Sequence, residues 1–263
     1  MQRSFCYFVV FLCLILIACN VSNISSEPRI LTVYAAASLT DAFTEIGMGF
    51  EAAHSGVNIV FNFGGSQNLR TQIEQGASAD VFASANTKEM DTLVAGKFVK
   101  VDAPKVFLTN QLVVILPKDN PAGIRALEDL GKPGLKLVLA AEEVPAGKYA
   151  RQILENLNAS LGVDYKDKVL ANVVSNEDNI RQAVTKVQLG EADASIVYVS
   201  DAVAAPELLR VEFPADVNVI AQYPIAPLLG SANSDLTNEF VAYVLSSDGQ
   251  ATLKKWGFTP IVP

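Results

Sequence analysis

The sequence predicts an α/β fold with two lobes and a cleft between them. β-rich apolar runs alternate repeatedly with helix-type patterns, as in α/β proteins whose sheets are largely parallel. A β-branched run at 111–116 starts a second series of such units, and prolines at 224 and 227 mark a return crossover to the first. We therefore expect a discontinuous first lobe, 28–110 with 223–263, and a second lobe, 111–222.

Each expected element rests on periodicity and on the residues that end it. Strands are short apolar runs that end at small residues or turns, and glycines such as Gly76, Gly96 and Gly190 stop the helices. The expected strands are 30–34, 57–63, 79–83, 111–116, 136–140, 169–173, 194–199 and 217–222. The expected helices are 39–53, 67–75, 87–95, 124–130, 147–159, 177–189 (capped by Asn176), 233–246 and 249–256.

The N-terminal residues read as an export signal. Arg3 precedes an apolar run at 5–17 that is too short for a good membrane-spanning helix. The sequence Leu16-Ile-Ala-Cys19 resembles the bacterial lipobox, in which cleavage before the cysteine is followed by its lipidation. We expect a signal peptide at 1–18, lipidation of Cys19 and a polar tether at 19–27. An ordinary signal with an incidental cysteine is the alternative.

Composition excludes several classes of protein. The net charge is −8 and no basic run occurs, so nucleic acid is not an expected partner. Cys6 and Cys13 would leave with the signal peptide, so neither a disulfide framework nor a cysteine metal site is expected.

Two strand-to-helix turns end in a serine. Ser38 follows three alanines, and Ser66 follows Gly64-Gly65. A serine at a helix start caps the helix, and the same hydroxyl, together with free helix N–H groups, can bind an anion. The cap alone explains either serine, but two such turns from neighbouring units would face one crevice.

The second lobe has comparable features. The turn Val144-Pro-Ala146-Gly147 can present backbone N–H groups, although it can also be a simple proline turn. Glu142 and Glu143, just before it, should face solvent or a partner because they would repel an anion. Tyr198, near a strand end, offers a hydroxyl of suitable reach, or it packs in the core with its hydroxyl at the rim.

Enzyme motifs are not found in the sequence. It contains no Gly-x-Ser-x-Gly, His-Glu-x-x-His or Walker pattern, and a dinucleotide-type glycine pattern at 47–52 falls inside an expected helix. The single histidine, His54, lies in a polar turn and reads as a solvated loop residue. The enzyme alternative is an envelope hydrolase with Ser38 or Ser66 as nucleophile and His54 as base.

Four blocks in this order resemble the molybdate-binding periplasmic proteins of bacterial ABC importers. They are Ala35-Ala-Ala-Ser38-Leu-Thr, Gly76-Ala-Ser-Ala-Asp80-Val-Phe-Ala-Ser84-Ala, Val144-Pro-Ala-Gly-Lys-Tyr-Ala150 and Ile196-Val-Tyr-Val-Ser-Asp-Ala202. The resemblance implies a type II periplasmic binding protein fold, in which two α/β lobes joined by hinge strands close over a tetrahedral oxyanion. Matched by motif, the ligand-binding residues are Ser38, Ser66, Ala146, Ile180 and Tyr198.

The resemblance also implies a function. Together with the lipobox-like sequence, which predicts the lipid anchor, it predicts an extracytoplasmic, monomeric protein that carries molybdate or tungstate to a membrane permease and its ATPase, without catalysis, cofactor or direct metal ligands. Sulfate or another tetrahedral oxyanion is the alternative ligand. Gly64-Gly65-Ser66-Gln67 departs from the more serine-rich version of some members, and Ile180 stands where valine is common.

Overall fold

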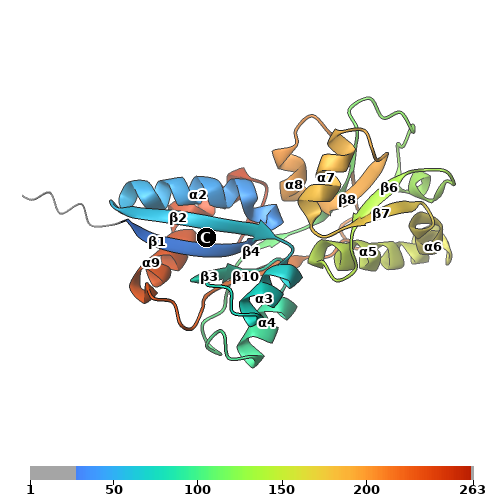
Figure 1. Cartoon of the computed structure of the whole chain (residues 1–263). Coiled ribbons are helices and arrows are strands. Elements are labelled where there is room, and N and C mark those ends of the chain that lie inside the picture. The colour runs from blue at the N-terminus through green and yellow to red at the C-terminus, as the bar shows by residue number, and fades with distance from the viewer. Residues whose placement is uncertain (1–27, 262–263) are drawn as a thin grey trace, which may run out of the picture.

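The polypeptide passes from one β-sheet to a second sheet and then returns (Figure 1). The computed structural model describes residues 28–261, so the expected signal peptide, Cys19 and tether lie outside the described residues. The first sheet has six strands in the order β11-β4-β10-β3-β1-β2, and the second has five in the order β7-β6-β8-β5-β9. We call the regions built on these sheets the first and second lobes.

Helices cover both faces of the first sheet. Val33 of β1 packs in the same cluster as Phe43 and Phe240, whereas the adjacent Tyr34 packs with Leu69 on the opposite face, as the alternation of a strand requires. The strands of this lobe are β1 (Arg29–Ala36), β2 (Val57–Gly64), β3 (Val81–Ala83), β4 (Lys105–Asn110), β10 (Ala221–Pro227) and β11 (Thr259–Pro260). Its helices are the 3₁₀ turn η1 (Ala37–Leu39), α2 (Thr40–Ala53), α3 (Ser66–Glu74), α4 (Thr87–Ala95), α9 (Ser234–Leu245) and α10 (Ser247–Lys255).

The second lobe is built on a sheet whose central strands are fully buried. All five residues of β5 and of β8 are buried, as in strands covered on both faces. The strands are β5 (Leu112–Leu116), β6 (Leu137–Ala140), β7 (Val173–Glu177), β8 (Ala194–Tyr198) and β9 (Leu209–Glu212). The helices are the 3₁₀ turn η2 (Leu127–Gly131), α5 (Pro145–Leu161), α6 (Tyr165–Leu170), α7 (Ile180–Gln188) and α8 (Val199–Ala204).

The two crossings between the lobes lie side by side. One runs from Asn110 at the end of β4 to Leu112 at the start of β5, and the other leads from β9 to β10. The side chain of Asn218 on the second crossing accepts from the Leu112 N–H (3.2 Å) and donates to the Leu112 carbonyl (2.9 Å). The two crossings are therefore tied together at the point where the chain leaves each lobe.

The two-lobed α/β architecture is confirmed, but the expectation of largely parallel sheets is wrong. β1 pairs in parallel with β2 and β3, and β6 with β7 and β8. The remaining pairings, made by β4, β5, β9, β10 and β11, are antiparallel. In the first sheet β10 and β11 run opposite to β1–β4, and in the second sheet β5 runs opposite to the other four strands, which makes both sheets mixed.

Two local predictions in the second lobe are wrong. The strand expected at 169–173 begins only at Val173, because Tyr165 and Val169 are buried one helical turn apart in α6, and β7 follows this helix. The helix expected from 177 therefore begins only at Ile180. The helix expected at 124–130 is a turn followed by η2, in which Asp129 Oδ2 accepts from two backbone N–H groups just upstream and so competes with helix formation.

The return crossover was also predicted in the wrong place. Pro224 and Pro227 lie within β10, which starts at Ala221, four residues after the expected strand start. A bulge between Tyr223 and Pro224 accommodates the missing proline N–H in the ladder with β4. The strands β4, β9 and β11 were not predicted.

Candidate functional site

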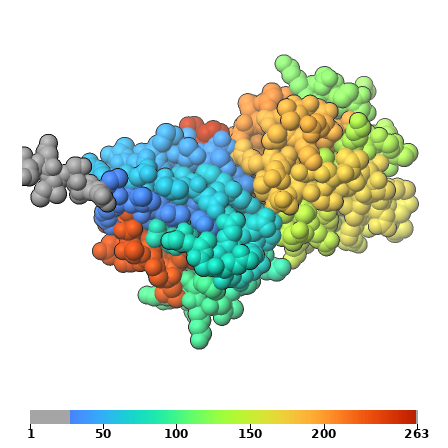
Figure 2. Space-filling model, in the orientation of Figure 1, coloured from blue at the N-terminus to red at the C-terminus, as the bar shows by residue number. Residues whose placement is uncertain are grey.

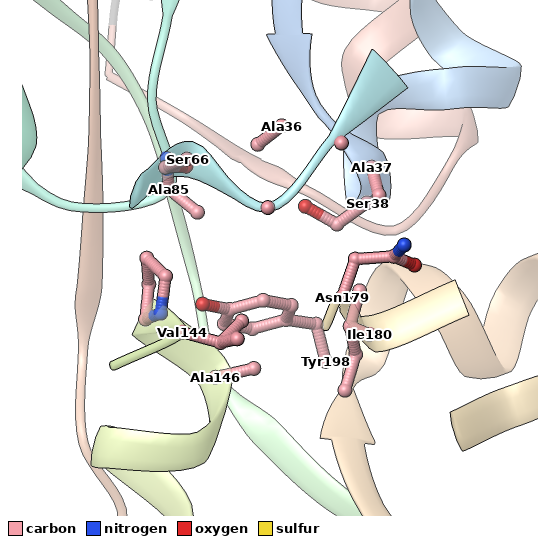
Figure 3. A pocket seen from close by; sticks show the side chains of 13 residues that line it. Ala36, Ala37, Ser38, Ser66, Ala85, Val144, Ala146, Asn179, Ile180 and Tyr198 are labelled. Atoms are coloured by element: carbon pink, nitrogen blue, oxygen red, sulfur yellow. Dashed lines mark hydrogen bonds between the residues drawn. The ribbon is translucent and has the colours of Figure 1, made fainter. Parts of the chain in front are cut away.

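A cavity lies where the ends of strands from both lobes meet (Figure 3). The first lobe contributes the residues after β1, β2 and β3, and the second contributes the starts of α5 and α7 and the end of β8. The lining residues are Ala36, Ala37, Ser38, Gly64, Gly65, Ser66, Ala85, Val144, Pro145, Ala146, Asn179, Ile180 and Tyr198. The cavity volume is about 10 Å³, roughly the space of one small group and far below the roughly 300–1,000 Å³ of pockets for drug-sized molecules. This size suits a small ligand.

The structure brings all five predicted ligand-binding residues to this cavity. Ser38 and Ser66 come from the first lobe, and Ala146, Ile180 and Tyr198 from the second. Their roles as ligands stay a prediction. Glu142 and Glu143 are exposed, as expected, and are not among the residues that line the cavity.

Ser38 is not the helix cap that the sequence suggested. It lies in η1, and the residue that precedes α2 is Leu39, with no side-chain cap bond. The Ser38 hydroxyl lies 2.9 Å from the hydroxyl of Tyr223, and the side chain is only 2% exposed. The Ser38 hydroxyl does not bond to the first N–H groups of α2, so it is available to the cavity. Figure 3 shows it pointing toward the cavity.

Ser66 also differs from the predicted cap. Gly65 occupies the cap position, and Ser66 is the first residue of α3. The Ser66 oxygen accepts a hydrogen bond from the Ala85 N–H at 3.0 Å. This bond uses a lone pair and holds the side chain in place, so the hydroxyl proton of Ser66 can be donated into the cavity.

Two helices begin at the cavity without a capping side chain. Neither α3 nor α5 has a side-chain bond to its first N–H groups, and α5 starts with Pro145, whose fixed backbone angle suits that position. The first N–H groups of a helix carry partial positive charge. These two N-termini therefore make the cavity favourable for an anion.

Tyr198 supplies a buried hydroxyl with an unused proton. The side chain is 1% exposed, and its hydroxyl has no hydrogen-bond partner among the described residues. Burial raises the pKa of Tyr198 well above its ordinary value, so the hydroxyl keeps its proton. A buried donor without a partner is costly unless a ligand accepts from it.

Charges lie beside the cavity but not on its wall. None of the thirteen described residues that line it has an ionisable acid or base apart from the tyrosine hydroxyl. Next to the cavity, Arg181 of the second lobe pairs with Asp41 of the first lobe, and its Nε lies 3.1 Å from Asp201 Oδ1. The Arg181 cation is therefore balanced by carboxylates and does not face a ligand as a free charge.

Asp201 connects this ion pair to Tyr198. It is fully buried, and its Oδ2 accepts from the Tyr198 N–H at 3.2 Å. Desolvation raises the pKa of Asp201 to about 6, although the Arg181 cation acts in the opposite direction. The strand end that carries Tyr198 is thus held by a carboxylate.

Sequence reasoning missed Asn179, Ala85 and Tyr223. Asn179, and not Asn176, caps α7, where its side chain accepts from the Gln182 N–H at 3.2 Å. The spacing of Asn179 and Gln182 is that of a capping box and could have indicated this start. Ala85 and Tyr223 carry no such local signal, because long-range packing brings them to the site.

The hydrolase alternative with Ser38 as nucleophile lacks its base. Ser38 precedes α2 and His54 follows it, so the fourteen residues of that helix separate them by about 21 Å at about 1.5 Å per residue. His54 instead stacks on Phe50 and bonds through Nδ1 to the Phe50 carbonyl at 2.8 Å. His54 lies in the turn after α2, as expected, but its side chain is only 30% exposed because it packs on Phe50.

Two other kinds of site were sought in the described chain: a metal centre and a membrane-spanning helix. Residues 28–261 contain no cluster of three or more His, Cys, Asp or Glu side chains arranged to hold a metal ion. Within the same range, no helix has both the length and the apolar character needed to cross a membrane.

Comparisons with known proteins agree with the motifs. A family model described as bacterial extracellular solute-binding protein matches residues 31–259. The chain is 39% identical over 251 residues to the molybdate-binding protein ModA of Mycobacterium tuberculosis, with 92% of each chain covered. It is 34% identical over 244 residues to ModA of Escherichia coli, covering 90% of this chain and 91% of that protein.

A solved structure gives the same result. The substrate-binding domain assigned to a molybdenum ABC transporter from Clostridium difficile is 33% identical, with a TM-score of 0.66 over 89% of this chain and 99% of that one. The resemblance to molybdate-binding proteins, stated from four motifs, is confirmed at the level of the whole chain. The chain belongs to the family of bacterial extracellular solute-binding proteins.

Proposed function

We propose that this protein captures molybdate, and also tungstate, outside the cytoplasm and delivers it to the permease of an ABC importer driven by an ATPase. The observation that carries the proposal is the small cavity between the lobes, which is lined by hydroxyl and N–H donors and by no charged side chain. The relatives named as molybdate-binding proteins support the choice of ligand.

The proposed donors come from both lobes. The hydroxyls of Ser38, Ser66 and Tyr198 and the backbone N–H groups of Ala146 and Ile180 would surround the oxygens of a tetrahedral dianion. Hydrogen bonds to a charged acceptor are stronger than neutral ones, so several donors can hold a dianion without a counter-charge. Closure of both lobes on one ion would place all five donors around it.

These five donors, which we call the ligand cage, also account for a preference among oxyanions. A protonated oxyanion, such as hydrogen phosphate, carries a proton that needs an acceptor. The three hydroxyls and two N–H groups would meet it mainly as donors, and the unpaired proton would be penalised. We therefore expect molybdate and tungstate to bind, phosphate to bind poorly, and sulfate to be the competing ligand that cavity size must exclude.

Calorimetric titration of the mature protein with molybdate, tungstate, sulfate and phosphate tests this proposal. The expected result is saturable binding of molybdate and tungstate and weak or no binding of phosphate. Strongest binding of sulfate would make the protein a sulfate carrier. The absence of binding heat with both molybdate and tungstate would contradict the proposed function.

We further propose that the protein acts as a lipid-anchored monomer in the cell envelope, without a cofactor and without catalysis. The lipobox-like sequence that ends at Cys19 supports the anchor. Mass spectrometry of the membrane-extracted protein should find a diacylglyceryl group on Cys19, and Cys19→Ser should release the protein from the membrane. An unmodified mature N-terminus would exclude the anchor.

A further inference from the structure

Tyr223 lies directly behind Ser38 and does not line the cavity. Its side chain is 0% exposed, and its hydroxyl oxygen lies 2.9 Å from the Ser38 Oγ. A buried tyrosine hydroxyl needs a hydrogen-bond partner. For Tyr223, the partner is a residue that the proposed function places against the ligand.

Tyr223 reaches this position through the fold of the first lobe. It lies on β10, the strand that brings the chain back from the second lobe, directly before the bulge at Pro224. Its ring packs edge-on against Tyr198 and Phe258, with centroid distances of 5.7 and 5.8 Å. The ring is held from two sides, so the hydroxyl has a defined direction.

The direction of the proton between the two hydroxyls decides what Ser38 can offer. Either oxygen can be the donor. A serine hydroxyl has one proton. If Ser38 donated to Tyr223, only its lone pairs would face the cavity, and these repel an anion. If Tyr223 donates, the Ser38 proton is left for the ligand.

The protonation state of Tyr223 permits the second arrangement, and a bound anion favours it. Burial raises the pKa of Tyr223 above its ordinary value, so the phenol keeps its proton at every pH at which the protein is expected to work. A hydroxyl that accepts a hydrogen bond also becomes a better donor, because chains of hydrogen bonds polarise one another. A bound anion would therefore align both protons toward itself.

We propose that Tyr223 is a positioning residue, which donates to Ser38 Oγ and thereby directs the Ser38 proton at the bound oxyanion. This inference rests on the proposed function but names a residue outside the ligand cage. It implies that the Tyr223 hydroxyl acts only through Ser38.

A double-mutant cycle with Tyr223→Phe and Ser38→Ala tests this inference by molybdate titration. Tyr223→Phe is expected to lower the affinity about tenfold, in the range of one lost buried hydrogen bond. In the Ser38→Ala background, the same change should have no further effect. Losses that add, or an unchanged affinity of the Tyr223→Phe protein, would overturn the inference.

Tyr165→Phe is the matched control. The Tyr165 hydroxyl is also buried, and it donates to the Leu127 carbonyl at 2.5 Å in the second lobe, away from the cavity. The control should keep the affinity of the unmodified protein. If the role of Tyr223 were merely structural, Tyr223→Phe and Tyr165→Phe would change the molybdate affinity alike. The effect of Tyr223→Phe would then be the same with Ser38 and in the Ser38→Ala background.

A second substitution covers the case in which Tyr223→Phe does not fold. Incorporation of 3-fluorotyrosine at position 223 keeps the hydroxyl and makes it a stronger donor. The affinity should then rise with Ser38 present and stay unchanged in the Ser38→Ala protein, and any other pattern would contradict the inference. If the unmodified protein binds neither molybdate nor tungstate, it is the proposed function that fails.

Discussion

At the scale of single residues, the site is built from buried donors whose positions are fixed by hydrogen bonds to neighbouring groups. Ser66 is fixed by the Ala85 N–H, Ser38 lies against the Tyr223 hydroxyl, and Tyr198 is carried on a strand end bonded to Asp201. Hydroxyls held in this way lose little conformational freedom when a ligand arrives. The one ionisable group among these supports that titrates near neutral pH is Asp201.

Asp201 should make folding stability depend on pH. Its pKa in the folded protein is about 6, above the ordinary 3.8, because burial penalises the carboxylate. The folded state therefore binds the proton more tightly than the unfolded state, and the contribution of Asp201 to stability falls as pH rises from about 4 to about 6. The fall is on the order of 3 kcal/mol when the pKa rises from 3.8 to about 6.

Denaturant unfolding of the protein and of Asp201→Asn between pH 4 and 8 measures this contribution. The unfolding free energy of the unmodified protein should drop relative to that of the variant between pH 4 and 6 and stay level above pH 7. Two parallel profiles would contradict the assignment.

At the scale of elements, the close approach of α3 and α7 needs a residue without a side chain. A Cβ built at Gly65 would lie 2.5 Å from the carbonyl oxygen of Asp178, just before α7 in the other lobe. Gly65 has φ −62°, which any residue can adopt. Glycine is therefore needed here because there is no room for a side chain, and not because of backbone conformation. The adjacent Gln67 side chain donates to the same carbonyl at 3.2 Å.

Gly65→Ala should therefore weaken ligand binding without unfolding the first lobe. The new methyl group keeps the turn before α3 and the turn before α7 apart, and the donors of the two lobes then cannot meet around one ion. We expect at least a tenfold loss of molybdate affinity, equal to about 1.4 kcal/mol, with a small change in melting temperature.

Gly131→Ala is the control for this change. A Cβ there would meet neighbouring atoms at ordinary contact distances of 3.6–3.7 Å, far from the cavity. This variant should bind as the unmodified protein does. Equal affinities of Gly65→Ala and the unmodified protein would show that the lobes close without this contact.

At the scale of the whole molecule, the two lobes meet along the edge of the cavity. In the space-filling view, the blue and cyan atoms of the first lobe touch the orange and yellow atoms of the second (Figure 2). The ion pair of Asp41 and Arg181 and the bond from Gln67 to Asp178 span this junction. Contacts between the lobes therefore contribute to their arrangement in the absence of a ligand.

Asp41→Asn should shift the protein toward an open arrangement. The side chains of Asp41 and Arg181 are 33% and 27% exposed, and such a pair contributes about 1 kcal/mol or less. We expect a larger radius of gyration in X-ray scattering of the ligand-free protein, and up to about fivefold weaker molybdate binding.

Asp235→Asn provides the matched charge control. Asp235 is an exposed acid in the first turn of α9 and lies outside the junction. It should change neither the scattering curve nor the affinity. Identical scattering of Asp41→Asn and the unmodified protein would show that the ion pair does not influence closure.

Sequence reasoning succeeded where the relevant signal is local. A strand, a small-residue turn and a helix start are neighbours in the chain, so the turns at Ser38, Ser66 and Ala146 could be recognised and expected at one crevice. The roles given to Ser38 and Ser66 as caps were wrong. A residue placed one position earlier or later, Leu39 or Gly65, takes the cap position, and periodicity does not resolve one residue.

By itself, the sequence determined that this protein is two-lobed and α/β, that polar turns gather at the ends of its strands, and that it is similar to oxyanion-binding proteins. Only the tertiary structure decided which distant residues contact those turns and which pairs join the two lobes. Tyr223 and Ser38 are 185 residues apart, and Arg181 and Asp41 are 140 apart. Such pairs depend on how strand β10 returns and how the lobes meet, and no local propensity encodes either of these.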